Sequence, residues 1–374
     1  MSRLRVALVA GTLGRGGAEK QFVYMATALR EAGAEVRTYS MTRGEHHESA
    51  LAEHGLAPTW VGWSALPPLR VAALAAAVSR FRPHVLQAGH FFLNLHVTAA
   101  AALTGAVAVG AIRSDVSYEL ATHGRWGPQL LRIPPDLVTN TWAAKAAAER
   151  LGRRPATVHV VPNVIDVAAF DVAAGTPPDS GRTGAVALAV GSLLPVKRFD
   201  RFLDALAAAR RRGAPLAGAV VGDGPERTAL EGLAARLGLL PDGVRFLGAR
   251  SDVPALLADA DFLVVTSGHE GFPNVVLEAY AASRPVIATP CGDLERLIRE
   301  ETTGFVVPFD DVEALADRMV RLAESAELRR RAGVAGRRLV ERSYGRAALA
   351  GHLLSAYQAI AARRRSPQLA AVLA

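Results

Sequence analysis

Residues 262–279 read FLVVTSGHEGFPNVVLEA. Four consecutive apolar residues open this segment, a turn containing Gly268 and Gly271 follows, and the stretch from Pro273 onward is suited to a helix. A short apolar run that is bounded by turn residues and followed by a helix predicts a buried strand of a parallel sheet. The segment therefore predicts one strand–helix unit of an α/β fold.

Units of the same kind recur along the whole chain. In the first half, strands are expected at 6–10, 36–40, 85–87, 107–112, 137–140 and 158–161. In the second half, strands are expected at 186–190, 216–221, 244–247, 262–265 and 285–288, with helices between them such as 200–212 and 225–237. Two complete series predict two doubly wound, Rossmann-like parallel-sheet domains that face each other across a cleft.

The expected domain boundary lies in a stretch rich in Gly, Pro, Asp and Ser, residues 173–184. This divides the chain into an N-terminal domain, 1–168, and a C-terminal domain, 169–345. The last segment, 346–374, contains a predicted helix, and whether that helix crosses back to the first domain is left open by the sequence. Its tail from residue 366 is expected to be loosely ordered.

Length and composition exclude several classes of protein. The chain has 374 residues, of which 50% are hydrophobic and 21% charged, so collagen-like, coiled-coil and wholly disordered structures are excluded. The single cysteine, Cys291, excludes an intrachain disulfide and a cysteine-only metal site, which fits a reducing compartment. The apolar run Val6–Ala10 is too short for a signal peptide. We therefore expect a cytoplasmic protein.

The formal net charge of +8 comes mainly from arginines scattered along the chain. Short clusters such as 210–212 and 363–365 suit either solvated helix ends or a weak attraction to anionic lipid. No aromatic-rich RNA-binding motif or zinc-finger spacing accompanies them. We therefore expect no nucleic-acid partner.

A glycine-rich turn follows the first predicted strand. In it, Gly16 and Gly17 precede an expected helix, and glycines at such a helix start let backbone N–H groups approach an anion. The spacing is not the dinucleotide-binding G-x-G-x-x-G, and no acidic residue ends the second strand, so an NAD enzyme is disfavoured. The same glycines also suit a tight turn without a ligand.

The segment after residues 262–265 predicts a second anion site. Pro273 suits the first turn of a helix, so the N–H groups near Asn274 to Val276 would point out of the sheet edge. Glu270 and Glu278 bracket this position. Carboxylates beside a phosphate site do not favour the phosphate, but they suit the hydroxyl groups of sugars. Each carboxylate taken alone also fits an ordinary loop or helix charge.

Two further strand ends are followed by candidate binding residues. Lys197 comes just before a helix that Asp200 is expected to cap, where it could reach a phosphate or remain a surface lysine. The turn of Gly222, Asp223 and Gly224 could accept a flat ring or simply reverse the chain. Both follow strands of the second series, and ligands of open parallel sheets bind beyond the carboxyl ends of strands.

With these motifs, the chain resembles glycosyltransferase family 4, whose members are retaining, nucleotide-sugar-dependent enzymes of the GT-B fold. The resemblance covers nearly the whole chain and rests on motifs in a specific order: Gly16-Gly17-Ala18-Glu19, Pro162-Asn163-Val164-Ile165-Asp166, Lys197, Gly222-Asp223-Gly224-Pro225, Phe246-Leu247-Gly248 and the Glu270 and Glu278 pair with seven residues between them. It implies a nucleoside-diphosphate sugar as donor, with a UDP-sugar favoured over a GDP-sugar, and a hydroxyl group as acceptor. It also implies front-face attack that is assisted by the leaving phosphate, with no metal and no other cofactor.

The resemblance also implies roles for individual residues. Glu270 would hold donor-sugar hydroxyls and Glu278 the ribose, while Lys197 would neutralise the distal phosphate. The donor phosphates would be bound by Gly16, Gly17, Gly271, Phe272, Pro273, Asn274 and Val275. The nucleotide base would lie by Gly222, Asp223, Gly224, Leu247 and Val253.

The chain also departs from the family pattern. Ser192 stands where an arginine is usual, so half of the cationic clamp is missing, and Arg198 is the candidate substitute. The usual histidine after the fourth predicted strand is replaced by a segment with Arg113 and Asp115, which together with His90 are candidates for contacting the acceptor or the sugar. These three roles stay open.

The expected function is therefore retaining transfer of a sugar to a lipid-linked, polysaccharide or small-molecule acceptor. The surface 115–135 mixes aromatic and apolar residues with arginines, which suits either peripheral contact with an anionic membrane, on the inner face of the plasma membrane, or an ordinary amphipathic helix. Two alternatives keep the fold. They are a nucleotide-sugar epimerase, and a non-catalytic nucleotide-sugar-binding protein, which the missing arginine at Ser192 motivates.

Overall fold

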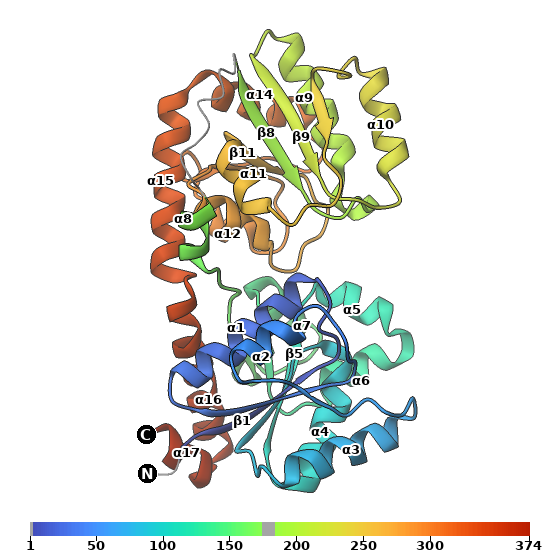
Figure 1. Ribbon diagram of the computed structural model, residues 1–374, viewed down its shortest axis with the longest axis vertical. Helices are drawn as coiled ribbons and strands as arrows, with labels where there is room; N and C mark the ends of the chain where they lie inside the picture. The colour runs from blue at the N-terminus through green and yellow to red at the C-terminus, as the bar shows by residue number, and fades with distance from the viewer. Residues whose placement is uncertain (1–2, 174–183) are drawn as a thin grey trace. The chain divides into compact units, whose positions relative to one another are not determined.

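The computed structural model describes residues 3–173 and 184–374 and divides into two compact units (Figure 1). Unit 1 consists of Met1–Val164 and Arg346–Ala374, and unit 2 consists of Ile165–Gly345. The first break falls four residues before the predicted boundary at residue 168. Most of the predicted linker, 173–184, lies outside the described residues.

Unit 1 is built on a parallel sheet in the order β3-β2-β1-β4-β5-β6-β7. Its strands are β1 (Arg5–Ala10), β2 (Glu35–Ser40), β3 (Thr59–Trp60), β4 (Val85–Ala88), β5 (Val107–Ile112), β6 (Leu137–Thr139) and β7 (Val158–Val160). Its helices are α1 (Gly17–Glu31), α2 (Glu48–Glu53), α3 (Pro67–Ser79), α4 (Asn94–Thr104), α5 (Val116–Thr122), α6 (Gly127–Arg132), α7 (Trp142–Arg150), α16 (Arg346–Arg364) and α17 (Pro367–Leu373).

The central strands of unit 1 are apolar without alternation because helices cover both faces of the sheet. On one face, α1 and α16 pack over Val6, Leu8 and Val109. On the other face, α3 and α4 pack over Ala7 and Val9. Consecutive residues of β1 therefore enter two different cores, as the pleat of a strand requires.

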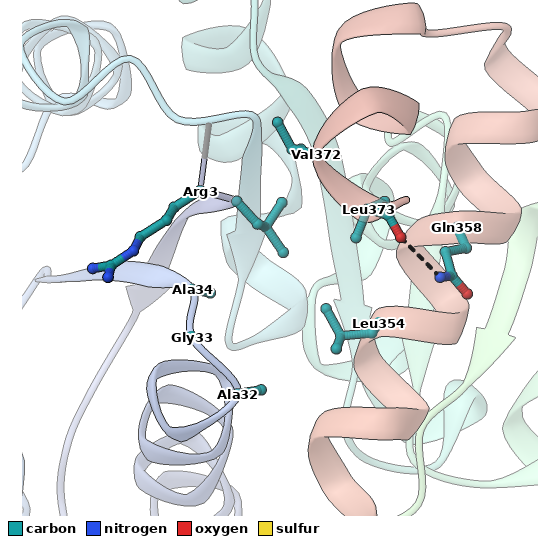
Figure 2. Close-up of a pocket in the computed structure, with 9 residues that line it drawn as sticks. Arg3, Ala32, Gly33, Ala34, Leu354, Gln358, Val372 and Leu373 are labelled. Atoms are coloured by element: carbon teal, nitrogen blue, oxygen red, sulfur yellow. Dashed lines mark hydrogen bonds between the residues drawn. The ribbon is translucent and has the colours of Figure 1, made fainter. Parts of the chain in front are cut away.

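The chain ends in an ordered helix, which corrects the prediction of a loosely ordered tail. Ser366 caps α17 by accepting the N–H of Leu369, and Pro367 occupies its first turn, where the missing N–H costs nothing. Figure 2 shows the end of α17 beside Arg3, with the Gln358 side chain of α16 donating to the carbonyl of Leu373 at 3.2 Å. Cap, proline and side-chain contact together fix the tail on unit 1.

Unit 2 is built on a second parallel sheet in the order β10-β9-β8-β11-β12-β13. Its strands are β8 (Ala185–Val190), β9 (Leu216–Val221), β10 (Val244–Phe246), β11 (Phe262–Val265), β12 (Val286–Ala288) and β13 (Gly304–Val306). Its helices are α8 (Val167–Ala173), α9 (Phe199–Arg211), α10 (Arg227–Arg236), α11 (Val253–Asp259), α12 (Asn274–Ala281), α13 (Leu294–Leu297), α14 (Val312–Glu324) and α15 (Ala326–Ser343).

These two sheets confirm the prediction of two Rossmann-like domains. In both, the strand order reverses beside the first strand of the unit, between β1 and β4 in unit 1 and between β8 and β11 in unit 2. At such a reversal, the loops after the two strands diverge to opposite faces and leave room for a ligand. The reversal points therefore define where a site is expected in each unit.

Candidate active site

Three loops meet at the carboxyl edge of the unit 2 sheet. The N–H of Gly191, after β8, donates to the carbonyl of Val221 at 2.9 Å, and the N–H of Leu193 donates to the carbonyl of Asp223 at 2.9 Å. The N–H of Gly268, after β11, donates to the carbonyl of Val196 at 2.8 Å. The loops after β8, β9 and β11 are thus hydrogen-bonded into one surface.

The glycine turn after β9 is needed for this close approach. Gly222 has a φ of +139°, and a Cβ built there would lie 1.9 Å from the carbonyl oxygen of Gly191. Gly224 has a φ of +159°, and its Cβ would lie 2.6 Å from the carbonyl oxygen of Leu193. Side chains at these two positions would therefore push the loops apart.

Lys197 and Glu270, which are 73 residues apart in sequence, meet at the reversal point of unit 2. Lys197 Nζ lies 2.6 Å from Glu270 Oε1, and the side chains are 27% and 12% exposed. Ser267 Oγ donates to the same carboxylate oxygen at 2.6 Å. Because both side chains remain partly accessible to solvent, this ion pair can separate. Lys197 can then bind a phosphate and Glu270 a sugar hydroxyl.

Two threonine side chains hold the loops that contain Lys197 and Glu270. Thr266 Oγ1, just after β11, contacts the carbonyl oxygens of Lys197 and Arg198 at 3.1 and 2.8 Å. Thr289 Oγ1, after β12, donates to the carbonyl of Ser267 at 2.7 Å. The buried threonines therefore position both halves of the Lys197–Glu270 pair.

The segment after Glu270 starts α12 as predicted. Pro273 is the residue before the first helical residue and has no N–H to offer an anion, and its carbonyl accepts the N–H of Val276 at 3.0 Å. Phe272 is buried, while Gly271, Asn274 and Val275 stay partly exposed. Glu278 lies one turn further along α12 and is also partly exposed. The geometry therefore leaves a helix start beside Glu270 open to a ligand.

The guanidinium of Arg198 binds Asp200, two residues further along the chain. Its guanidinium donates to both carboxylate oxygens of Asp200, with distances of 2.8–3.1 Å. Hydrogen bonding to Asp200 raises the pKa of Arg198 above its ordinary value. The prediction that Asp200 caps α9 is wrong: the residue before the helix is Arg198, with φ +51°, and Asp200 lies in the first turn. Its carboxylate binds the guanidinium of Arg198.

The predicted base-binding residues lie at neighbouring strand ends. The N–H of Gly222 donates to the carbonyl of Gly248 at 2.8 Å, which joins the glycine turn to the exit of β10. Leu247 and Val253 are partly buried, and both pack on the core that also contains Val221. Asp223 stays exposed, with Oδ1 accepting the N–H of Gly224 at 2.8 Å. An apolar floor with an exposed carboxylate at its rim suits a flat polar ring.

In unit 1, the reversal point holds His90 and the glycine-rich turn. The N–H of Gly11 donates to His90 Nδ1 at 3.1 Å, and His90 Nε2 lies 3.4 Å from Glu19 Oε1. A Cβ at Gly16 would lie 2.1 Å from Glu19 Oε2, so the carboxylate of Glu19 covers this glycine at the start of α1. Burial raises the pKa of Glu19, but the hydrogen bonds to His90 and to its own backbone N–H, together with the charges of His90 and His47, keep the pKa below its ordinary value. An anion at Gly16 and Gly17 would have to displace this carboxylate.

Arg113 and Asp115 follow β5 but have different surroundings. Arg113 Nη2 lies 2.6 Å from Met25 Sδ, and its buried Nε forms no hydrogen bond within the described residues. Burial lowers the pKa of Arg113 to about 10. Asp115 caps α5, with Oδ1 accepting the N–H of Tyr118 at 3.0 Å. Asp115 therefore has a structural role, which the sequence analysis did not assign to it.

Glu119 and His123 are two residues that sequence reasoning missed. Glu119 Oε2 lies 3.5 Å from His123 Nε2, and the His123 ring stacks on Phe91 with 5.6 Å between centroids. Burial, with a contribution from the charge of Asp115, raises the pKa of Glu119 to about 7. The available signal was their spacing of four residues on a predicted helix, which places both on one face.

The raised pKa of Glu119 makes stability depend on pH. Its ordinary pKa is 4.5, so between pH 4.5 and about 7 the folded state binds more protons than the unfolded state, and stability is lost as the pH rises. Glu119→Gln, which is neutral throughout, is expected to stabilise unit 1 by ~1–2 kcal/mol more at pH 8 than at pH 5. Urea unfolding at both pH values checks this, with Glu53→Gln at an exposed position as the control. An equal gain at both pH values would contradict it.

The described residues contain no group of three or more His, Cys, Asp or Glu side chains arranged to hold a metal ion. Burial raises the pKa of Cys291 to about 12, so its thiol stays protonated. Among the described residues, no helix combines the length and the apolar character needed to cross a membrane.

Family models match both units. The model for "Glycosyltransferase Family 4" matches residues 15–169, and the model for "Glycosyl transferases group 1" matches residues 184–325. The chain therefore belongs to the family 4 glycosyltransferases, which confirms the resemblance seen in the motifs.

Named relatives agree with this family. The D-inositol 3-phosphate glycosyltransferase of Salinispora tropica is 36% identical over 212 residues, which are 51% of this chain and 44% of the relative. The alpha-D-kanosaminyltransferase of Streptomyces kanamyceticus is 31% identical over 177 residues, which are 47% and 46% of the two chains. The matched regions thus span about half the length of these relatives.

Solved structures share the fold along nearly the whole chain. HepE of Anabaena in complex with UDP superimposes with a TM-score of 0.82 at 19% identity, covering 94% of this chain and 99% of HepE. Its complex with UDP-glucose gives a TM-score of 0.79 at the same identity and coverage. At this identity the likeness shows the GT-B fold alone.

Proposed function

We propose that the protein is a retaining glycosyltransferase that moves a sugar from a nucleoside-diphosphate sugar to a hydroxyl acceptor. The observation that most directly supports this is the Lys197–Glu270 pair at the reversal point of the unit 2 sheet, inside the region that the family model matches. The pair supplies one cation for a phosphate and one carboxylate for sugar hydroxyls. Unit 2 is accordingly the donor-binding domain and unit 1 the acceptor-binding domain.

The proposed donor is a UDP-sugar. HepE, which shares the fold, has been crystallised with UDP and with UDP-glucose, and this supports a uridine nucleotide over a guanosine nucleotide. In the proposed complex, the base lies on Leu247 and Val253 beside the Gly222 turn, and the ribose hydroxyls bind Glu278. The phosphates lie at the start of α12, between residues 271 and 275, and reach Lys197.

The reaction needs no protein nucleophile. The bond between the anomeric carbon and the phosphate oxygen breaks, and a bond forms between the same carbon and the acceptor oxygen on the same face. The acceptor proton moves to the departing phosphate oxygen, so charge and atoms balance. Lys197 and the N–H groups at the helix start stabilise the leaving phosphate, because preorganised donors act where charge develops. Glu270 orients the sugar and does not attack.

Transfer with retention is the direct test of this function. The protein is incubated with UDP-glucose and a panel of hydroxyl acceptors, UDP release is measured, and proton NMR gives the anomeric configuration of the product. An α-linked product from an α-linked donor is expected. A β-linked product would contradict retention, an epimerised donor would favour the epimerase, and binding of donor without turnover on any acceptor would favour the non-catalytic alternative.

Transfer is expected to be independent of divalent metal ions, because Lys197 and backbone N–H groups supply the positive charge at the leaving phosphate. Initial rates in excess EDTA should equal those in magnesium. A loss of activity in EDTA that magnesium restores would contradict this expectation.

A surface of unit 1 suits contact with an anionic membrane. Tyr118 and Trp126 are 64% and 56% exposed, and the Arg125 guanidinium lies 5.7 Å from the centre of the Trp126 ring. Exposed aromatic rings beside arginines are typical of proteins that lie on a membrane interface. Co-sedimentation with anionic vesicles tests this contact, and protein that stays in the supernatant at low salt would contradict it.

A further inference from the structure

A cavity of about 450 Å³ lies at one edge of unit 1. The residues that line it are far in sequence from those of the proposed donor site. The edge strand β7, the helix α7 and the helix α16 form its walls. Its polar lining consists of Lys145, His159, His352, Ser355 and Arg363, and no carboxylate lines it. Its size is that of a site for a small molecule.

Two imidazole rings, those of His159 and His352, belong to this lining. His352 Nδ1 is buried and forms no hydrogen bond within the described part of the chain, whereas the buried His159 Nε2 lies 3.5 Å from Asp136 Oδ1. Burial lowers the pKa of His352. Buried polar atoms without partners are exceptions in folded proteins, so the unpaired nitrogen of His352 favours a polar ligand in this cavity.

The charges around the cavity are unbalanced. Asp136, fully buried, is bound by the Arg363 guanidinium at 3.2 and 2.6 Å, and Arg364 and His159 lie 3.7 and 3.5 Å from its carboxylate. The other acid nearby is Glu149, 3.9 Å from Lys145.

Arg153 adds a further positive charge. Its guanidinium donates to the carbonyls of Arg132 and Pro135 and interacts electrostatically with Asp136. Lys145 and Arg363 line the cavity, and Arg153 and Arg364 lie near Asp136, so four cations accompany two carboxylates at this edge of unit 1. The surplus of two positive charges matches the charge of a phosphate monoester near neutral pH.

We propose that this cavity binds a small phosphate-bearing molecule, with the phosphate between Lys145, His159 and His352. The remaining wall is apolar, formed by side chains such as Val158 and Ala356, and suits a small apolar body attached to the phosphate. None of these residues belongs to the proposed donor or acceptor sites, so this is a second ligand site.

A ligand in this cavity would contact two segments of unit 1 that lie close in sequence to unit 2. β7 ends at Val160, four residues before the chain leaves unit 1 after Val164, and α16 begins at Arg346, where the chain returns. A ligand in the cavity therefore joins the two segments of unit 1 that are continuous with unit 2. Binding here is expected to stabilise the docking of α16 on β7.

Histidine NMR tests the proposal on the full chain, with inorganic pyrophosphate as the probe. The imidazole resonances of His159 and His352 are assigned by their loss in His159→Gln and His352→Gln. We expect saturable shifts of both imidazole resonances on titration. Binding should be at least tenfold weaker in Lys145→Ala and unchanged in Arg330→Ala, which removes an exposed cation elsewhere. Lys145 is partly exposed, so its replacement should not prevent folding.

The same titration of Lys197→Ala separates this site from the donor site, because pyrophosphate at Lys197 would not shift these two resonances. Vesicles containing phosphatidate form a second arm: shifts or broadening with vesicles alone, lost in Lys145→Ala, would identify a lipid headgroup as the source of the phosphate. The absence of a saturable response in both arms, or a response that Lys145→Ala leaves unchanged, would overturn the proposal.

Discussion

Lys197→Ala is expected to lower the turnover number for sugar transfer by roughly 10²- to 10³-fold, the scale for losing one preorganised donor at a developing negative charge. The ammonium group lies 2.6 Å from Glu270 at the reversal point of the sheet, where the leaving phosphate is proposed to form. Stabilisation is needed most in the transition state, so the loss should appear in turnover more than in donor affinity. Initial rates at saturating donor measure it.

Two further variants sharpen this test. Arg198→Ala should have a small effect, because Asp200 already holds the guanidinium. Arg250→Ala, which breaks an exposed pair with Asp252, is the control for loss of a surface cation. Near-normal turnover in Lys197→Ala together with a large loss in Arg198→Ala would place the phosphate clamp at Arg198 and contradict our assignment.

Asp136→Ala is expected to destabilise unit 1 by about 3 kcal/mol, since removing one partner of a buried ion pair typically costs 3–5 kcal/mol and the arginine partners here are partly exposed. The carboxylate is fully buried, and it holds Arg363 by two hydrogen bonds and Arg364 at 3.7 Å. Its loss leaves the end of α16 with two arginines and no counter-charge. Urea unfolding of the full chain, followed by circular dichroism, measures the change.

The matched control is Asp252→Ala, which removes the carboxylate of an exposed Arg–Asp pair and should leave the unfolding curve unchanged. Comparing the two variants separates burial from pairing as the source of the effect. If Asp136→Ala unfolded at the same urea concentration as the wild type, α16 would be held by its apolar contacts alone, and the proposed role of Asp136 would be wrong.

The strands that sequence predicted are those with a local signal. Apolar runs such as Val107–Ile112 are buried on both faces, so their composition alone identifies them. Two strands, β3 and β13, were not predicted, and both lie at sheet edges. Thr59–Trp60 is exposed and becomes a strand because it pairs with Tyr39 and Ser40, a long-range contact that leaves no periodicity in two residues. Short edge strands are set by their neighbours and not by their own sequence.

The tail shows a different kind of error. Ser366 followed by Pro367 is a helix-start signal, and the structure uses it to begin α17. The prediction of a loosely ordered tail rested on the general tendency of chain ends to be mobile. The local signal here was sufficient and was overlooked.

For the candidate site, strand ends and loops could be predicted, but the partners of individual side chains could not. Lys197 and Glu270 each follow a predicted strand, yet their 2.6 Å contact depends on β8 and β11 being neighbours. Arg198 looked like a spare cation because its pairing with Asp200 depends on a left-handed backbone at residue 198. The raised pKa of Glu119 depends on burial, which one sequence does not show.

The central claim is that unit 2 binds a nucleoside diphosphate through the edge that contains Glu278. Calorimetric titration of wild type and Glu278→Ala with UDP, GDP, ADP and NAD tests it most directly. We predict that UDP binds the wild type and that the variant binds it at least tenfold more weakly, because a charged hydrogen bond to the ribose is worth ~1.5–3 kcal/mol. Equal UDP affinity in both proteins, or no binding of any diphosphate by the wild type, would contradict the account.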